Sequence, residues 1–275
     1  YSKSLTIKEE LENKNYDRLI AAFKKAGELG LFMTVVPEEW GGLGCSETVN
    51  ALVAEKLATY GSWSVTHGAH ATIGTLPIVY FGNEETKAMV LPKSASGEWV
   101  GAYCLTEPGS GSDALAARTQ ALSVDGGFSI TGNKQFITNG GFADYFTVFA
   151  QVNPATAEGG RNFTGFLALR SGGGIEPQAE EHKMGVRGSS TTPVRFEECF
   201  VPEGQRLGEE GKGHRIAFGI LNIGRLKLAA ASVGGAKLAL GGAMRYVKER
   251  RQFGRAIADF RLTKHKVGTL AADLY

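Results

Sequence analysis

Cysteine is scarce in this sequence. The 275 residues contain three, Cys45, Cys104 and Cys199, an odd number without the spacing of metal ligands. Structural disulfides belong mainly to oxidising compartments. The cysteines therefore favour a fold without disulfides in a reducing compartment, and they give no sign of a metal site.

Other classes of protein are excluded by what is missing. No apolar run approaches the roughly 18 residues that a membrane-spanning helix needs. The N-terminal stretch YSKSLTIKEELENK is charged and has no apolar signal-peptide segment, so we expect a protein that is not secreted. The net charge of +2 is too small to indicate a nucleic-acid partner.

Glycine, by contrast, is abundant. It accounts for 38 of the 275 residues, about twice its usual share. Glycine is favoured where a chain turns tightly or where the backbone closely approaches a ligand. Apolar residues make up 43% and charged residues 21%, which is typical of a globular protein with a sizeable core.

Residues 1–98 are expected to form a helical domain, because apolar residues recur there at near-helical spacing. Gly30 suits the position that ends the first long helix, and Ser62 and Asn83 are expected to cap two later ones. The apolar stripes consist of Leu11, Leu19, Ile20, Phe23 and Leu29 and, after a turn-rich break at 37–44, of Val49, Leu52, Val53 and Leu57.

Residues 99–208 are expected to form an antiparallel β domain, a barrel or a sandwich. Short segments rich in β-branched and aromatic residues are separated there by Gly, Asn and Asp. Because strands do not alternate with helices, a Rossmann dinucleotide fold is disfavoured. The expected strands are 99–106, 127–138, 145–152, 164–170 and 194–201.

Residues 209–275 return to a helical pattern and are expected to begin a C-terminal helical bundle that is incomplete in this chain. A long helix is expected over 214–250. Its glycines at 234, 235, 241 and 242 allow close helix packing or mark a bend. The whole sequence thus predicts an α+β multidomain fold in the order helices, sheet, helices.

The stretch Tyr103–Asp113, YCLTEPGSGSD, joins the end of a strand to a loop rich in glycine and serine. Pro108 stops the strand, and Gly109 and Gly111 allow close approach of the backbone to a partner. Successive free N–H groups in such a loop can bind a phosphate or pyrophosphate. The same residues also suit a serine-rich hairpin turn, and both interpretations stay open at this point.

Three other segments are less specific by themselves. Asn133–Gly141, NKQFITNGG, could wall a flat ring system, but a strand running into a Gly-Gly turn is the commoner explanation. Lys183–Thr191 fits a surface loop before an edge strand. From Gly211 to Tyr275 there are 13 Lys and Arg against three acids. This basic segment is either a solvated helix face or a docking surface for phosphates.

Taken together, six motifs in register resemble those of the acyl-CoA dehydrogenases. They are YCLTEPGSGSD, FITNGG, KMGVRGSST followed by FEECFVP, GEEGKG, LNIGRLKLAA and RRQFG. Their order and spacing match that family from about residue 20 to the end of the chain. GAHATIGTLPIVYFG and LNIGR are most similar to the branch that acts on long and very long acyl chains.

The resemblance implies an FAD enzyme that introduces an α,β double bond into fatty acyl-CoA thioesters, the first step of fatty acid β-oxidation. It also implies a homodimer or homotetramer, because part of each flavin site comes from a neighbouring subunit. Phe136 stands where many members have Trp, so an indole N–H donor is absent. The implied flavin residues are Tyr103, Leu105, Thr106, Gly111, Ser112, Phe136, Ile137 and Thr138, with Arg250 and Phe253 reaching the FAD of the neighbouring subunit.

By the same resemblance, Ser112, Asn222 and Arg225 lie near the reacting end of the substrate. The reaction needs a carboxylate base for the α-proton, which some members carry in the helix matched by LNIGR. This chain has Gly224 at that position, and residues 214–248 contain no Asp or Glu.

We therefore expect no catalytic base in this chain and place the base beyond Tyr275. The apolar stripe of Val267, Leu270 and Leu274 reaches that residue without a stop signal. The 275 residues alone are then not expected to turn over substrate.

A long acyl chain is the expected substrate. The segment His67–Gly74 is expected to be a helix whose small residues, Gly68, Ala71 and Gly74, leave a deep channel for the tail. Close packing of helices would explain the same small residues, and the two interpretations are held as nearly equal.

The resemblance also implies an electron-transferring flavoprotein as the acceptor, no metal, and a location in the bacterial cytoplasm or the mitochondrial matrix of a eukaryote. Two alternatives share the fold. An acyl-CoA oxidase would pass its electrons to O₂, and a non-catalytic member would bind acyl-CoA or serve as an assembly partner.

Overall fold

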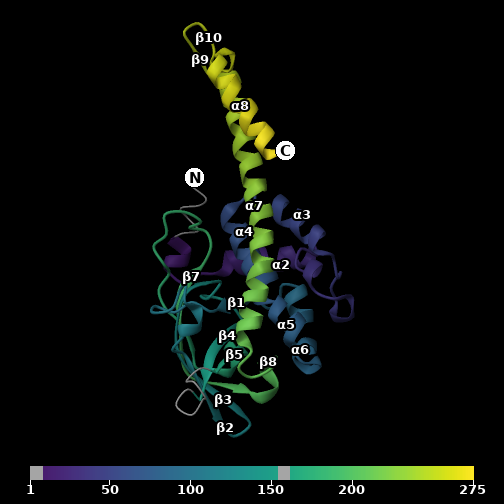
Figure 1. Cartoon of the computed structure of the whole chain (residues 1–275), viewed down its shortest axis with the longest axis vertical. Coiled ribbons are helices and arrows are strands. Elements are labelled where there is room, and N and C mark those ends of the chain that lie inside the picture. Colours follow the sequence, from purple (N-terminus) through teal and green to yellow (C-terminus); the bar gives the residue numbers. More distant parts are fainter. Residues whose placement is uncertain (1–8, 154–161) are drawn as a thin grey trace.

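The computed structural model describes residues 9–153 and 162–275. Helices come first, a sheet follows, and a long helix runs past both (Figure 1). The expected order of helices, sheet and helices is confirmed.

The N-terminal domain is helical, and its boundaries follow two of the three expected signals. Gly30 has a φ of +73° just beyond the first helix, and the Asn83 side chain accepts a hydrogen bond from the Thr86 N–H at 2.8 Å. Ser62 is not a cap: its hydroxyl accepts a hydrogen bond from the distant Gly188 N–H at 3.1 Å, and the helix begins one residue earlier. The helices are α2 (Asp17–Glu28), α3 (Glu47–Leu57), α4 (Gly61–Gly68), the π-helical η3 (Ala69–Gly74), α5 (Leu76–Phe81) and α6 (Glu84–Ala95).

Helix α3 turns a different face inward from the one its apolar stripe predicts. Val49 and Leu52 are 40% and 55% exposed, so their expected place in the core is wrong. The inward face starts at Asn50, which is 5% exposed, and continues at helical spacing. This face consists of Asn50, Val53, Ala54 and Leu57.

The middle domain is a mixed sheet in the order β6-β7-β3-β2-β4-β5-β8, with β1 also on β4. Most neighbouring strands pair antiparallel, as expected, but β1 and β2 both pair parallel with β4. A long connection between two strands imposes no hairpin, so these pairs are free to be parallel. The strands are β1 (Gly101–Cys104), β2 (Gln120–Val124), β3 (Gly127–Thr138), β4 (Tyr145–Val152), β5 (Phe163–Leu169), β6 (Ile175–Pro177), β7 (Thr191–Pro202) and β8 (Arg206–Leu207).

Three further details of the sheet differ from expectation. Strands β2, β6 and β8 were not predicted, since β2 buries only Ala121 and the other two are short. The strand after the Lys183–Thr191 loop is not an edge strand, because β7 lies between β6 and β3. The terminal strands β6 and β8 do not pair with each other, so the described sheet does not close into a barrel.

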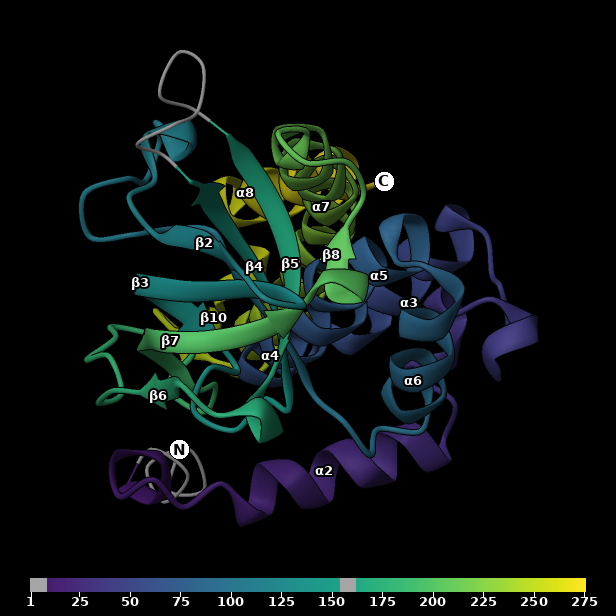
Figure 2. The same ribbon diagram turned by 90° about the horizontal axis from the view of Figure 1, so that it is seen from below.

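The core forms on both faces of the sheet, because side chains alternate along each strand. Tyr145 and Phe149 of β4 join Phe23 and Phe32 in the layer between sheet and helices. Phe146, from the other face of β4, belongs to a second apolar cluster within the sheet domain. Figure 2 shows α2 running beside the sheet.

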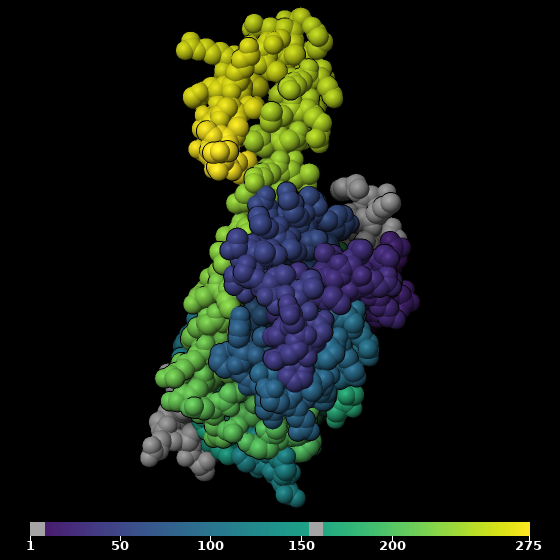
Figure 3. Space-filling model, turned by 90° about the vertical axis from the view of Figure 1, so that its right-hand side faces the viewer, coloured from purple at the N-terminus to yellow at the C-terminus, as the bar shows by residue number. Residues whose placement is uncertain are grey.

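The C-terminal part is one long helix and its return. Helix α7 (Gly213–Glu249) runs unbroken through its glycines, and the hairpin of β9 (Arg251–Gln252) and β10 (Arg255–Ala256) leads into α8 (Arg261–Leu274). The first half of α7 packs on the body, whereas its end projects together with α8 (Figure 3). By length and hydropathy alone α7 could also cross a membrane, but a helix of a folded bundle can meet the same criteria.

Gly234 fixes how closely α7 crosses α3, and this gives a first testable prediction. A Cβ at Gly234 would lie 2.0 Å from the Glu55 carbonyl oxygen, whereas one at Gly235 would meet nothing within 4 Å. We expect Gly234→Ala to be destabilising, because overpacking typically costs about 1–3 kcal/mol and outweighs the gain in helix propensity. Gly235→Ala should stabilise by about 0.5–1 kcal/mol. Urea unfolding of both variants checks this, and equal stabilities would contradict it.

Candidate functional site

The loop after β1 has two halves with different roles. Backbone hydrogen bonds join Glu107 and Ser110 in both directions, at 2.9 and 3.1 Å, and close a tight turn. The N–H groups of Gly111, Ser112 and Asp113 that follow have no acceptor within the described residues. Nothing lies within 4 Å of a Cβ placed at Gly111. The hairpin interpretation therefore fits the first half of the loop, and the phosphate-binding interpretation fits the second.

A buried ion pair anchors this loop to β3. Lys134 is fully buried, and its ammonium donates to Glu107 Oε1 at 2.8 Å and to the Leu105 carbonyl at 3.2 Å. The Glu107 carboxylate also accepts from the N–H groups of Arg118 at 2.6 Å and Thr119 at 3.1 Å. Both residues of the pair lie in the sequence motifs, but no role was predicted for either.

The electrostatics of the pair follow from these contacts. Burial would raise the pKa of Glu107, but Lys134 and the N–H donors hold it below its ordinary value. Burial lowers the pKa of Lys134, and the Glu107 charge opposes that change. Three donors to one carboxylate favour its ionised form, and the ionised carboxylate in turn favours the charged form of Lys134.

One cavity, here called the loop cavity, brings the expected flavin residues of the middle domain together. It has a volume of about 360 Å³. Phe136 is 61% exposed, because a φ of +59° at a register shift turns it out of the ladder. The expected residues that line the cavity are Tyr103, Leu105, Thr106, Gly111, Ser112, Phe136, Ile137 and Thr138, and Ile73, Ala114, Gln135, Phe218, Leu221 and Arg225 complete it.

The remaining expected residues are placed differently. Arg225 lines the loop cavity, but Asn222 does not; its side-chain oxygen instead accepts a hydrogen bond from Arg225 Nη1 at 2.6 Å. Arg250 and Phe253 lie at the projecting end of α7 (Figure 1). At 1.5 Å per residue, the 25 residues from Arg225 to Arg250 span about 37 Å. These two residues therefore cannot reach the loop cavity of their own chain.

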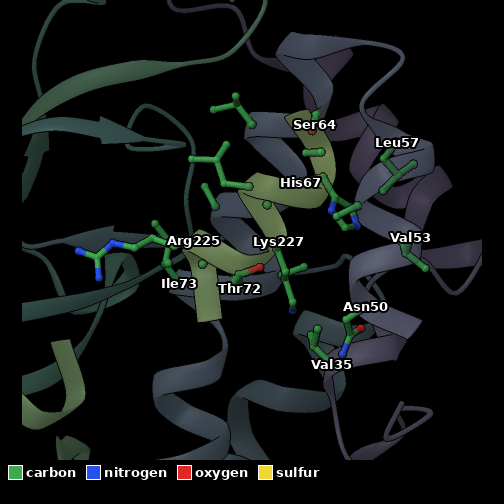
Figure 4. Close-up of a pocket in the computed structure, with 18 of the residues that line it drawn as sticks. Val35, Asn50, Val53, Leu57, Ser64, His67, Thr72, Ile73, Arg225 and Lys227 are labelled. Carbon is green, nitrogen blue, oxygen red and sulfur yellow. The ribbon is translucent and has the colours of Figure 1, made fainter. Parts of the chain in front are cut away.

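A second cavity, the helix cavity, lies between α3, α4, η3 and α7 and has a volume of about 300 Å³ (Figure 4). Its walls are mostly apolar. It shares Ile73, Thr138, Leu221 and Arg225 with the loop cavity. The two cavities therefore meet at a junction to which the N-terminal helices, the sheet and α7 each contribute.

The small residues of His67–Gly74 fit both interpretations that the sequence left open, because some line a cavity and another permits close packing. Gly68 and Ala71 line the helix cavity. Gly74 does not line this cavity. A Cβ at Gly74 would lie 3.0 Å from the backbone of Gly101, so this glycine permits close packing. The segment is π-helical from Ala69 to Gly74, and such short π segments are frequent at functional sites.

The side chains that line the two cavities suit an organic ligand. Over residues 9–153 and 162–275 no group of three or more His, Cys, Asp and Glu is placed to hold a metal ion. An apolar cavity that joins a polar loop rich in free N–H groups can hold a long apolar tail beside a phosphate-bearing group. The fold and the site thus fit a class of proteins whose ligands combine an apolar part with a phosphate-bearing group.

The chain belongs to the acyl-CoA dehydrogenase family. Models of that family's N-terminal, middle and C-terminal domains match residues 4–98, 102–199 and 211–275. A Bacillus subtilis acyl-CoA dehydrogenase is 39% identical over 93% of this chain and 67% of its own length.

Other relatives extend the comparison. A probable acyl-CoA dehydrogenase of Bacillus subtilis is 48% identical over 97% of this chain and 44% of its own. The human mitochondrial very long-chain specific acyl-CoA dehydrogenase is 41% identical over 90% of this chain and 39% of its own. A Bacillus anthracis acyl-CoA dehydrogenase, solved in complex with FAD, superposes with a TM-score of 0.91 at 46% identity and covers 98% of this chain and 47% of that one. The chain thus spans about half the length of these relatives.

Proposed function

We propose that this chain forms the flavin site and the acyl pocket of an FAD-dependent dehydrogenase of long-chain acyl-CoA thioesters. One observation supports this most. All eight middle-domain residues that the family resemblance assigns to the flavin line the loop cavity, which shares four lining residues with an adjacent apolar cavity. The FAD complex of the Bacillus anthracis relative and the very long-chain specificity of the human one agree with it.

The residues present fit FAD. Tyr103, Leu105 and Ile137 offer an apolar wall to a flat ring system, and the Tyr103 hydroxyl already donates to the Ala217 carbonyl at 3.2 Å. The free N–H groups of Gly111 and Ser112 suit the pyrophosphate. When bound, the flavin supplies the acceptor for the β-hydrogen of the substrate.

The chain's own residues then bind and orient the substrate. The apolar walls of the helix cavity hold the acyl tail and exclude water. Arg225 is held by Asn222 at the junction of the cavities, where the thioester would lie. Neither cavity has an Asp or Glu among its described lining residues. We therefore propose that the base for the α-proton comes from outside this chain.

The test is dehydrogenation of acyl-CoAs of graded length by the protein expressed from its complete coding sequence. An artificial electron acceptor is supplied under argon and under air. We expect palmitoyl-CoA to be oxidised in preference to butyryl-CoA and the rate to need the acceptor. Turnover in air without the acceptor would indicate an acyl-CoA oxidase, and absence of flavin would indicate a non-catalytic acyl-CoA-binding or assembly protein.

We also propose that the protein is a homodimer or homotetramer and passes electrons to an electron-transferring flavoprotein. Arg250 and Phe253 support the first proposal, because they lie far from the cavities of their own chain and Phe253 is 92% exposed. Both would then meet the FAD of a neighbouring subunit.

The variant Arg250→Lys tests this assignment. A guanidinium can pair with a phosphate through two parallel hydrogen bonds, which an ammonium cannot copy. We expect the affinity for FAD to fall on the order of tenfold, since one charge-assisted hydrogen bond is worth about 1.5–3 kcal/mol. Flavin retained after dialysis is the measurement. The adjacent Arg251→Lys is the control, and equal retention in both variants would contradict the role.

A further inference from the structure

The wall of the helix cavity contains a buried lysine. Lys227 of α7 is 8% exposed and lines the cavity, and Figure 4 shows its side chain in the space between Thr72 and Asn50. Its Nζ lies 3.8 Å from Glu47 Oε2, which is too far for a hydrogen bond. No other polar contact of this ammonium occurs within the part of the chain that the structure describes. A donor on a largely buried side chain thus lines the cavity without a hydrogen-bond acceptor among the described residues.

Two acceptors without a hydrogen bond lie on the facing helix α3. Glu47 Oε2 and Asn50 Oδ1 are both buried and have no hydrogen-bond partner. The amide nitrogen of Asn50 is oriented by a hydrogen bond to the Cys45 carbonyl at 3.3 Å, which leaves its oxygen free. Buried polar groups are paired in the great majority of cases, so each exception calls for an explanation.

A purely structural ion pair does not explain this arrangement. The same two helices carry a second pair, in which Lys237 Nζ lies 2.9 Å from Glu55 Oε1. That pair closes to hydrogen-bonding distance, whereas Lys227, which lines the cavity, stays 3.8 Å from Glu47. The open geometry leaves one donor and two acceptors available to a ligand group.

We propose that Lys227, Glu47 and Asn50 form a polar subsite for a hydroxyl group on the acyl tail. This inference rests on the proposed function, since it places the tail in the helix cavity. A hydroxyl accepts a hydrogen bond from Lys227 and donates one to Asn50 or Glu47. A plain alkyl tail leaves all three groups without a hydrogen-bond partner. A carboxylate offers acceptors only and would meet the Glu47 charge and the Asn50 oxygen.

The experiment measures binding separately from chemistry. S-alkyl-CoA thioethers lack the thioester carbonyl, so they bind without being oxidised. A series with one hydroxyl moved along the tail is compared with the plain thioether of equal length by calorimetry on the flavin-loaded protein. For each hydroxyl position, the Kd of the plain thioether is divided by the Kd of the hydroxylated one. In the wild type, this ratio is expected to have a maximum at one hydroxyl position.

Lys227→Met should lower the maximum ratio about tenfold. A site built to hydrogen-bond a hydroxyl group discriminates strongly against a ligand that lacks it, and methionine removes the donor. Asn50→Leu should lower the maximum ratio too and provides a second test should Lys227→Met fail to fold. Lys237→Met, in the paired and more exposed position on the same helix, should leave the maximum ratio unchanged.

The inference is overturned by a wild-type ratio without a maximum, by a maximum that Lys227→Met and Asn50→Leu leave intact, or by a stronger preference for a carboxylated tail. Failure of the proposed function is seen elsewhere: plain acyl-CoA thioesters would then not bleach the flavin under argon, whatever the thioether ratios show.

Discussion

Replacing Lys134 with methionine is expected to lower the free energy of unfolding by about 3–5 kcal/mol, the usual effect of removing one partner of a buried ion pair. The variant leaves the Glu107 carboxylate buried without its cation, and the Leu105 carbonyl loses a donor. Methionine has a similar length, so the loss reflects charge more than volume. The affinity for FAD should fall as well, because the pair anchors the loop that carries Gly111 and Ser112.

Urea unfolding and flavin content measure the two effects. Lys24→Met, at an exposed position of α2, is the control and should change stability by less than about 0.5 kcal/mol. If Lys134→Met were as stable as this control, the anchoring role of the pair would be wrong.

The variant Gly224→Leu is expected to lower kcat/KM selectively for long acyl chains. Gly224 lines the helix cavity, and a Cβ there would already lie 3.3 Å from Ile73 Cγ2 at the junction of the cavities. A leucine side chain would therefore occupy the space that the tail needs. Overpacking of about 1–3 kcal/mol corresponds to a fall of about 5- to 150-fold in kcat/KM for palmitoyl-CoA.

Short substrates provide the internal comparison. Butyryl-CoA does not extend far into the helix cavity, so its kcat/KM should change by less than about threefold. Gly219→Leu, on an open face of the same helix, is the matched control and should leave the chain-length profile intact. An equal loss of kcat/KM for both substrates in Gly224→Leu would indicate general damage to α7. It would contradict the assignment of the acyl tail to this cavity.

Local signals in the sequence predicted much of the fold. Gly30 and Asn83 mark helix ends through chemistry that is complete within a few residues. Strands β3 and β4 occupy the ranges predicted from their composition. The family motifs predicted eight flavin residues in two short segments, YCLTEPGSGSD and FITNGG, and these eight residues come together around the loop cavity.

The rest depends on partners that are distant in sequence. Ser62 has the chemistry of a cap, but Gly188 competes for its hydroxyl. From the sequence alone, Lys134 occupies a position that looks solvent-exposed. In the fold, its strand places it against Glu107, which is 27 residues away in the sequence. Lys227 lies in a basic segment where a solvated face is the ordinary interpretation, and only α3 makes it part of a cavity. No local pattern distinguishes such residues from their exposed neighbours.

The junction of the two cavities has a consequence for the inheritance of substrate preference. Ile73 belongs to the segment matched by the N-terminal domain model, Thr138 to the middle one, and Leu221 and Arg225 to the C-terminal one. Recombination that exchanges any single domain between relatives would therefore assemble a junction of mixed ancestry. We then expect chain-length preference to be epistatic, because it depends on the combination of all three domains. Transfer of one domain into a chimera would not transfer the preference.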